Sequence, residues 1–159
     1  MGKPSSRASL DEQSGRKEKP TPEKPRRFSV VMADDHHGTR EEVCRLLDCE
    51  FDVLRAVSDG VRLLEAAAEL HPDAIVTDVR MPRLTGIQAA AQLLARGLAS
   101  AVVALSVYAD AHLLNEALEV GILGYVLKVD AAEELIPAVY AALRGEAYLS
   151  IGVRDKCSG

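Results

Sequence analysis

The chain is poor in aromatic residues and contains no tryptophan. Phe, Tyr and Trp together make up 4% of its 159 residues, although 48% of the residues are hydrophobic. A folded core must therefore be built mainly from Ala, Val, Leu and Ile. The length is sufficient for one domain with a core of this kind.

Cysteines are few, and long apolar runs are missing. Cys44, Cys49 and Cys157 form no C-x-x-C pair, which favours free thiols in a reducing compartment over a disulfide or a metal site. No apolar run approaches the roughly 20 residues that span a bilayer, and the N-terminus lacks the apolar region of a signal peptide. These absences predict a soluble, cytoplasmic protein without a membrane partner.

Basic residues are rare outside the N-terminal part of the chain. Residues 1–27 contain eight of the 19 Lys and Arg and four of the 24 Asp and Glu, which leaves 11 basic and 20 acidic residues in the rest. An acidic body argues against a nucleic-acid-binding surface. Residues 1–27 also contain four of the seven prolines and only three hydrophobic residues. We therefore expect a disordered tail, solvated rather than bound to membrane or nucleic acid.

From Phe28 onward, short aliphatic runs alternate with longer stretches that have helical spacing. The runs typical of strands are 28–33, 51–57, 74–77, 101–106 and 124–128. Three of them are almost continuously apolar, as expected for strands covered on both faces. Alternation of this kind predicts an α/β fold with a parallel sheet and right-handed crossovers.

The last helical stretch carries three boundary signals. Asp130 and Glu133 have the spacing of a capping box at its start, and Gly145 marks its end. Pro137 lies about two turns inside the stretch, where proline removes a backbone hydrogen bond. This helix is therefore expected to bend or to start late.

Polar side chains follow four of the five expected strands at the point where each ends. Asp34 and Asp35 follow the first strand, Asp78 the third, Ser106 the fourth and Lys128 the fifth. Ligands of open parallel sheets bind outside the carboxyl ends of the strands. Each residue alone has an ordinary explanation as a cap, a turn residue or an exposed lysine. Three adjacent carboxylates, however, raise one another's pKa unless cations join them, and Lys128 and Mg²⁺ would supply those charges.

Phosphoryl transfer is the chemistry that this set of residues suits. Asp78 could act as a nucleophile and form an aspartyl phosphate. Lys128 and Mg²⁺ would neutralise the charge on the phosphoryl oxygens, and Ser106 would donate a hydrogen bond to one of them. The end of a buried strand gives such a carboxylate a rigid base.

Four motifs, in this order, closely resemble the receiver domain of bacterial two-component response regulators. They are VMADDHHGTR, TDVRMPRLTG, VVALSVY and GYVLK. Asp34, Asp78, Ser106 and Lys128 are separated by 44, 28 and 22 residues, and these intervals are typical of the family. The resemblance implies a flavodoxin-like, doubly wound (βα)5 fold with strand order 2-1-3-4-5. It covers residues 28–150, which we take as the domain, and leaves residues 151–159 as a C-terminal tail.

The resemblance also implies a role for each residue. Asp78 would accept a phosphoryl group from a histidine kinase or a phosphotransfer protein, and the chain would not be an enzyme beyond its own phosphotransfer and autodephosphorylation. The implied Mg²⁺ ligands are Asp34, Asp35, Asp78 and the backbone carbonyl of Arg80. Lys128 would pair with the phosphoryl group. Ser106 would move toward it while Tyr125 turns inward, which would remodel the surface formed by the fourth helix, the fifth strand and the fifth helix.

The motifs DDHH, GYVLK and RGEAYLS are most similar to the subfamily that carries a helix-turn-helix domain after the receiver. The sequence stops nine residues after Ser150, so it is either a natural single-domain regulator or a fragment, and it contains no recognisable DNA-binding motif. A homodimer is possible, although Pro137 puts contacts through the fifth helix in doubt.

Two residues near the site depart from the usual family pattern. Val129 follows Lys128 where many receivers have proline, so no cis peptide is expected there. His37 stands where this subfamily usually has proline, and it forms a pair with His36 beside the acidic residues. Histidines that face solvent are favoured here over a transition-metal site.

Two other functions remain open at this point. Phosphatases of the haloacid dehalogenase type also form an aspartyl phosphate, but they resemble a D-x-D pattern whose second Asp is replaced here by Arg80. A receiver-fold scaffold that binds proteins without being phosphorylated is the second alternative.

Overall fold

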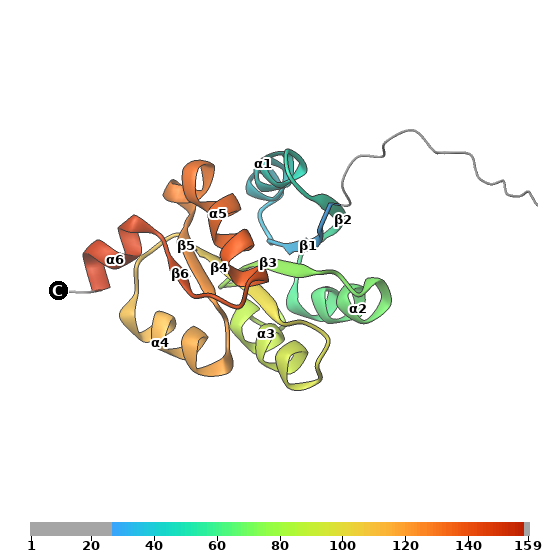
Figure 1. Cartoon of the computed structure of the whole chain (residues 1–159). Coiled ribbons are helices and arrows are strands. Elements are labelled where there is room, and N and C mark those ends of the chain that lie inside the picture. Colours follow the sequence, from blue (N-terminus) through green and yellow to red (C-terminus); the bar gives the residue numbers. More distant parts are fainter. Residues whose placement is uncertain (1–26, 158–159) are drawn as a thin grey trace, which may run out of the picture.

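A central parallel sheet is covered by helices on both faces (Figure 1) in the computed structural model, which describes residues 27–157. The strands are β1 (Ser29–Ala33), β2 (Asp52–Val57), β3 (Ala74–Asp78), β4 (Ala101–Ser106), β5 (Gly124–Leu127) and β6 (Tyr148–Leu149). The α-helices are α1 (His37–Asp48), α2 (Gly60–Leu70), α3 (Gly86–Ala95), α4 (Ala111–Val120), α5 (Ala131–Leu143) and α6 (Ile151–Cys157), and a 3-10 helix, η2 (Lys128–Asp130), precedes α5. The expected disordered tail lies outside the described residues, apart from Arg27.

The strand order is β2-β1-β3-β4-β5-β6. It confirms the expected order 2-1-3-4-5 and adds a short sixth strand beside β5. Tyr148 and Leu149 of this strand pair in parallel with Gly124 and Tyr125. The edge of the sheet at β5 is therefore covered by residues near the end of the chain.

Two aliphatic cores lie on opposite faces of the sheet, as a doubly wound fold requires. Helices α1 and α5 cover one face, and α2, α3 and α4 cover the other (Figure 1). Strands β3 and β4 are buried along their whole length, whereas the edge strand β2 is largely exposed. Each Val or Leu that is fully buried contributes about 1.5–3 kcal/mol relative to an exposed one, so the central strands anchor the sheet.

The start of helix α5 differs from the prediction. Helix α2 has a local cap, because the Asp59 carboxylate accepts a hydrogen bond from the backbone N–H of Arg62 (2.8 Å). Asp130 makes no such bond to α5, so the expected capping box is wrong. Its carboxylate accepts hydrogen bonds from Ser150 and Gly152 instead. A tertiary contact has replaced the local cap.

Helix α5 runs without interruption past Pro137, so the expected late start is also wrong. The proline is exposed, and the carbonyl of Glu133 that loses its intrahelical partner can bind water instead. Gly145 has a positive φ of 79° just beyond the helix. This left-handed conformation is one that glycine adopts easily, and it confirms the predicted stop.

Residues 151–157, which we took as part of a tail, form helix α6. Val153 is fully buried in the same core as Tyr125 and Leu127. A Cβ atom added to Gly152 would lie 2.5 Å from the Leu127 side chain and 2.8 Å from Asp130 Oδ2. Glycine is therefore required at this position for α6 to approach β5 so closely.

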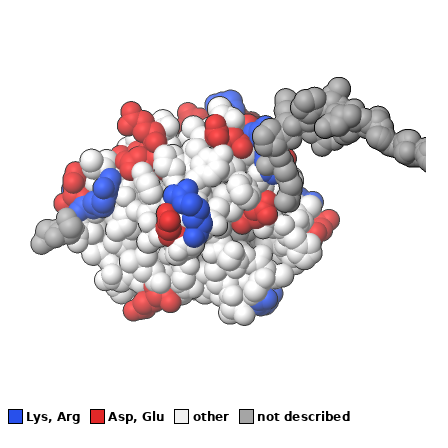
Figure 2. Space-filling model, in the orientation of Figure 1, with Lys and Arg blue, Asp and Glu red and all other residues white. Residues whose placement is uncertain are grey.

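Charged side chains of both signs are interspersed on the face of the molecule shown in Figure 2. The described residues visible there form no continuous basic patch, in keeping with the acidic composition of the body. Within residues 27–157, none of the helices is long and apolar enough to cross a membrane.

Candidate functional site

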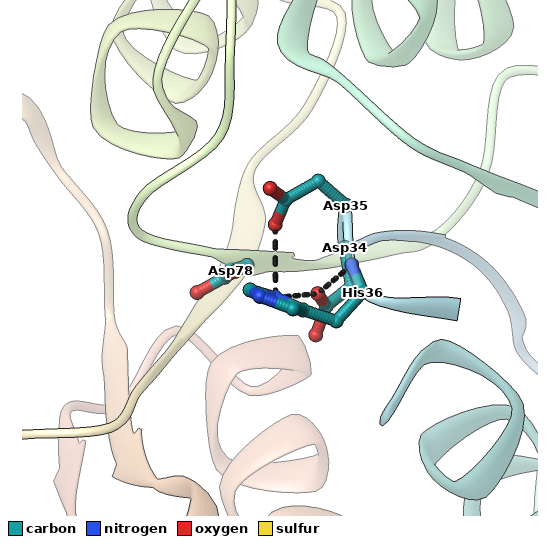
Figure 3. Close-up of side chains that lie close together, drawn as sticks. All are labelled: Asp34, Asp35, His36 and Asp78. Carbon is teal, nitrogen blue, oxygen red and sulfur yellow. Dashed lines mark hydrogen bonds and ion pairs between the residues drawn. The ribbon is translucent and has the colours of Figure 1, made fainter. Parts of the chain in front are cut away.

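The carboxyl ends of β1 and β3 bring three carboxylates together. Asp34 and Asp35 directly follow β1, and Asp78 is the last residue of β3. Potential ligand atoms of these three residues and of His36 all lie within 4.8 Å of one another (Figure 3). We refer to Asp34, Asp35 and Asp78 as the acidic pocket.

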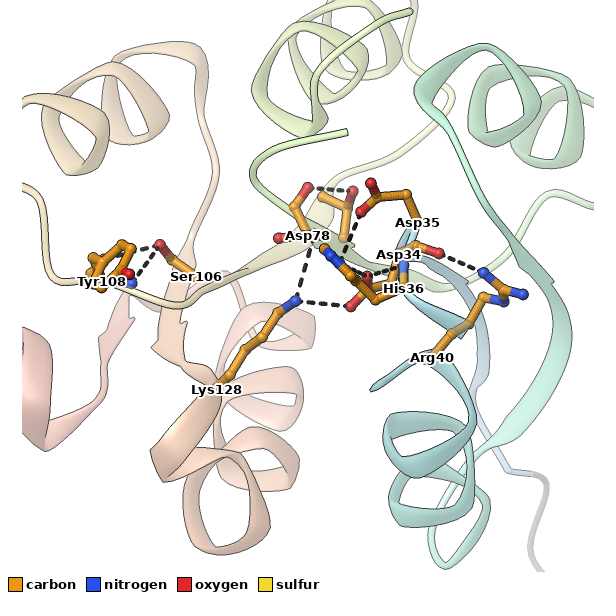
Figure 4. A network of polar contacts seen from close by, with 9 residues as sticks. Asp34, Asp35, His36, Arg40, Asp78, Ser106, Tyr108 and Lys128 are labelled. Atoms are coloured by element: carbon orange, nitrogen blue, oxygen red, sulfur yellow. Dashed lines mark hydrogen bonds and ion pairs between the residues drawn. The ribbon is translucent and has the colours of Figure 1, made fainter. Parts of the chain in front are cut away.

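Lys128 bridges two members of the acidic pocket from the end of β5 (Figure 4). Its Nζ atom lies 2.9 Å from Asp34 Oδ2 and 3.4 Å from Asp78 Oδ2. Asp34 is fully buried, and its second carboxylate oxygen accepts a hydrogen bond from the backbone N–H of His36 (2.8 Å). Partners of this kind are necessary because a buried charge without them is strongly destabilising.

Asp78 is held in an environment that disfavours its ionised form. Burial raises the pKa of Asp78 to about 6, and the charge of Asp34 acts in the same direction. The ammonium group of Lys128 and a hydrogen bond from the backbone of Arg80 lower it, without cancelling the effect of burial. Three carboxylates share the single ammonium group of Lys128 in the acidic pocket, so their negative charge is only partly compensated.

The backbone around Asp78 is fixed by a close contact with the start of α3. A Cβ atom added to Gly86 would lie 1.9 Å from the carbonyl oxygen of Asp78 and 2.9 Å from Thr77 Oγ1. The Thr77 hydroxyl also donates a hydrogen bond to the Asp78 carbonyl (3.0 Å). The glycine allows α3 to begin directly against the end of β3, which fixes the backbone from which the Asp78 carboxylate projects.

The acidic pocket is typical of a receiver Mg²⁺ site. Carboxylate oxygens are the ligands that this hard cation prefers, and the uncompensated charge at Asp78 is what a divalent cation would neutralise. Carboxylate oxygens of Asp34, Asp35 and Asp78 lie close enough together to hold one such ion. The role of the Arg80 backbone carbonyl stays a prediction.

The two histidines after the acidic pair differ in what they contact. The His36 side chain is 70% exposed, yet its Nδ1 atom lies 3.2 Å from Asp35 Oδ1 and 3.5 Å from Asp34 Oδ1. The His37 side chain is 73% exposed and pairs with Glu41 of α1 instead (3.3 Å). Both histidines face solvent as expected, and His36 also adds a nitrogen atom at the rim of the acidic pocket.

Ser106 is buried at the end of β4 and forms no hydrogen bond to Asp78 or Lys128. Its hydroxyl donates a hydrogen bond to the carbonyl of Tyr108 (2.9 Å; Figure 4). Tyr125 is fully buried, and its hydroxyl has no hydrogen-bond partner of normal geometry within residues 27–157. Burial raises the pKa of Tyr125, and the nearby Ser106 hydroxyl opposes this shift. Tyr125 thus already lies inward, and the concerted movement of the two side chains stays a prediction.

A pocket of about 190 Å³ opens beside Asp78. Its lining includes Asp78, Ser106, Lys128, Arg80 and His36. Larger hollows between α3 and α4 and between α1 and α5 do not include Asp78. The small pocket is thus the place where a ligand meets both the carboxylate and the ammonium group.

Sequence reasoning missed two sets of contacts near the site. Arg40 of α1 donates a hydrogen bond to the backbone carbonyl of Asp34 (2.8 Å). Ser150 and Asp130 contact each other and the residues that flank Lys128. The pairing of Ser150 with Asp130 joins positions 20 residues apart, and no local sequence signal predicts it.

Comparison with known proteins agrees with this geometry. Residues 30–140 match the family described as "Response regulator receiver domain". The transcriptional regulatory protein DegU of Brevibacillus brevis is 34% identical over 125 residues, which cover 77% of this chain and 53% of DegU. The transcriptional regulatory protein LiaR of Bacillus subtilis is 32% identical over 129 residues, or 80% of this chain and 61% of LiaR. The chain matches little more than half the length of these relatives.

Solved structures of receiver domains share the fold. The signal receiver domain of NarL from Mycobacterium tuberculosis superposes with a TM-score of 0.73 at 30% identity, covering 77% of this chain and all of that one. A LuxR-family two-component response regulator from Aurantimonas sp. SI85-9A1 gives a TM-score of 0.77 at 25% identity, covering 83% and 96% of the two chains.

Proposed function

Because the chain belongs to the response regulator receiver family and resembles NarL and other LuxR-family regulators, we propose that it is a phosphorylation-dependent signalling switch. Asp78 is the phosphoacceptor, and a histidine kinase or a phosphotransfer protein is the donor. The chain acts as a phosphoacceptor in the cytoplasm rather than as an enzyme that turns over a separate substrate.

Phosphorylation is a transfer between two side chains. A bond forms between a carboxylate oxygen of Asp78 and the phosphorus atom, while the P–N bond of the donor phosphohistidine breaks. The electron pair of that bond stays on the imidazole nitrogen of the donor, which then takes up a proton. The carboxylate must be ionised to attack, so the raised pKa of Asp78 makes the reaction dependent on the cations around it.

The acidic pocket, Lys128 and Ser106 would each stabilise the transferred phosphoryl group in a different way. Mg²⁺, held by Asp34, Asp35 and Asp78, supplies positive charge to the phosphoryl oxygens when it is bound. Lys128 already spans Asp34 and Asp78 and needs only a small movement to pair with a phosphoryl oxygen on Asp78. Ser106 must exchange its bond to the Tyr108 carbonyl for one to the phosphoryl group.

The conformational change that follows phosphorylation would reach the surface around β5. Exchange of the Ser106 hydrogen bond changes the packing next to the buried Tyr125 hydroxyl. Because β6 and α6 lie against β5, the surface that reports phosphorylation includes them as well as α4 and α5. Phosphorylation would shift the equilibrium between two arrangements of this surface, which a partner or an output domain reads.

A single observation carries the proposal: the ammonium group of Lys128 touches both Asp34 and Asp78 at the ends of three parallel strands. Intact-protein mass spectrometry after incubation with Mg²⁺ and phosphoramidate tests it. We expect wild type to gain one phosphoryl group and Asp78→Asn to gain none. Asp59→Asn is the matched control, because Asp59 is a buried carboxylate at the end of β2 that caps α2, and it should be phosphorylated like wild type.

The other outcomes point to the rival functions. A folded wild-type protein that gains no phosphoryl group, either from phosphoramidate or from a phosphorylated histidine kinase, would support a scaffold. Rapid, repeated release of phosphate from small phosphate esters would support a phosphatase instead. Slow loss of a single phosphoryl group agrees with a switch.

A further inference from the structure

Lys128 is fixed by a group of residues beyond the acidic pocket. Val129 follows Lys128 and lies on the surface of the molecule. Because its side chain is 84% exposed, Val129 buries little surface that could hold this segment in place. The backbone on either side of Lys128 must therefore be held by other contacts.

Ser150 makes those contacts. Its hydroxyl accepts a hydrogen bond from the backbone N–H of Leu127 (3.0 Å) and donates its only hydrogen to Asp130 Oδ2 (2.8 Å). The same carboxylate oxygen accepts the backbone N–H of Gly152 in the first turn of α6 (3.0 Å). We refer to Ser150, Asp130 and the N–H groups of Leu127 and Gly152 as the clasp.

The clasp joins the residues immediately before and shortly after Lys128. Leu127 is the last residue of β5, and Asp130 is the last residue of the 3-10 helix that begins with Lys128. Ser150 is fully buried and bonds to both, so it sets the length and direction of the short segment from which the lysine projects. The Ser150 hydroxyl accepts a hydrogen bond from the Leu127 backbone and donates one to the Asp130 carboxylate. The second is the stronger of the two, because its acceptor is charged.

We propose that Ser150 and Asp130 are positioning residues for phosphoryl transfer, which place the Lys128 ammonium group and tie α6 to the phosphoacceptor site. The inference rests on the proposed function of Asp78 and names residues that act through Lys128 rather than on the phosphoryl group. Helix α6 is then part of the switch, because any shift of Lys128 toward a phosphoryl group pulls on Leu127 and Asp130, and through them on Ser150 and Gly152.

A set of variants separates positioning from folding. Ser150→Ala and Asp130→Ala open the clasp, whereas Asp130→Asn keeps an acceptor oxygen for Ser150 and Gly152. Glu134→Ala is the matched control, because Glu134 holds the same chain segment through the Tyr148 hydroxyl and the Ile151 N–H but does not touch the Lys128 segment. The rate of phosphorylation by phosphoramidate is measured for each full-length variant, together with its thermal unfolding and its affinity for Mg²⁺.

We expect Ser150→Ala and Asp130→Ala to lower the maximal phosphorylation rate about tenfold, because small misplacements of a catalytic group are costly. The affinity for Mg²⁺ should change less than the rate, because the three carboxylates that would hold the cation are not substituted. Asp130→Asn and Glu134→Ala should keep rates near wild type. The double variant should be no slower than either single variant, because both residues serve one contact.

Two results would overturn the inference. Wild-type rates in Ser150→Ala and Asp130→Ala, with only the unfolding temperature lowered, would make the clasp purely structural. An equal loss of rate in Glu134→Ala would show that general loosening of the segment is responsible. If Ser150→Ala does not fold, the contrast between Asp130→Ala and Asp130→Asn decides alone. If wild type is not phosphorylated at all, the proposed function of Asp78 fails. That result is distinguishable from failure of the clasp proposal, because it requires no variant.

Discussion

The acidic pocket contacts the ammonium group of Lys128, whereas the clasp holds the backbone on either side of this residue. The two regions differ in how completely their polar groups are paired. In the pocket, burial and the charge of Asp34 raise the pKa of Asp78, and one ammonium group serves two carboxylates. In the clasp, the Ser150 hydroxyl is bonded on both sides, to Leu127 and to Asp130. The pocket is left short of positive charge, whereas the clasp is complete within the protein.

This difference has a physical meaning. The proposed cation and phosphoryl group would offset the electrostatic deficit of the pocket, which costs stability in the free protein. The polar groups of the clasp form hydrogen bonds with one another, and these bonds stabilise the fold. Substitutions in the two regions should therefore change stability with opposite signs or with different responses to Mg²⁺.

The largest change is expected for Lys128→Met. Asp34 and Asp78 would remain buried without their shared ammonium partner, which should lower the free energy of unfolding by about 3 kcal/mol in the presence of a chelator. Mg²⁺ should recover part of the loss, because the pocket without the ammonium group carries more negative charge and should bind the cation more tightly than the wild-type pocket does. Denaturant unfolding with and without Mg²⁺ measures both effects, and the exposed Lys156, replaced by Met, is the control. A loss that Mg²⁺ does not reduce would argue against a cation site in the pocket.

The next largest change is expected for Ser150→Ala. It leaves the Leu127 N–H buried without an acceptor and removes one donor from Asp130, so the free energy of unfolding should fall by about 2 kcal/mol. Mg²⁺ should not restore it, since no ligand of the cation is affected. The same denaturant titrations apply, and recovery by Mg²⁺ comparable to that of Lys128→Met would mean that the clasp and the pocket are one unit.

Asp78→Asn should stabilise the protein in the absence of divalent cations. The pKa of Asp78 rises from 3.8 to about 6 on folding, so the folded state binds more protons than the unfolded state between these values. Stability contributed by the protonated group is therefore lost as the pH rises from about 4 to 6. At pH 7.5 the variant should exceed wild type by about 1–2 kcal/mol, and the gap should narrow toward pH 4.

Thermal unfolding of both proteins in chelator, at several pH values, measures this gap. Asn removes the negative charge while leaving a side chain of the same shape, so the difference between the two proteins isolates the titration of Asp78 from that of other groups. A gap that does not depend on pH would contradict the raised pKa.

The smallest change in the free energy of unfolding is expected for Asp59→Ala. Asp59 lies just after β2 and belongs neither to the acidic pocket nor to the clasp. It caps α2 through the Arg62 N–H, and loss of such a cap costs about 1 kcal/mol. Neither Mg²⁺ nor phosphorylation should alter this cost. Unfolding titrations in both conditions test it, and a Mg²⁺-dependent cost would extend the acidic pocket to β2.

The parallel sheet and the convergence of the carboxylates could be predicted because each follows from a local pattern, whereas the strand order was implied by the resemblance to receiver domains. Val30–Ala33 and Ala74–Thr77 are apolar runs, and parallel pairing of such strands places the residues after them at one edge of the sheet. Asp34, Asp78 and Lys128 could thus be assigned to one site without coordinates. The cap formed by Asp59 is equally local, since it needs only a carboxylate three residues before a free N–H group.

The start of α5 could not be predicted in the same way. The spacing of Asp130 and Glu133 is that of a capping box, but Asp130 faces Ser150 and Gly152, which lie 20 and 22 residues further along the chain. The choice between a local cap and this distant pairing depends on where β6 and α6 pack. No pattern within a short window carries that information.

The sequence by itself determined the alternation of strands and helices, the aliphatic core and the chemistry available at the sheet edge, because these depend on side-chain type and on spacing within one element. Only the tertiary structure decided which partner each polar group takes, from the shared ammonium group of Lys128 to the two bonds of Ser150. The physical reason is that a hydrogen bond or an ion pair requires two groups within about 3–4 Å. Packing of the whole chain, rather than local preference, sets such distances.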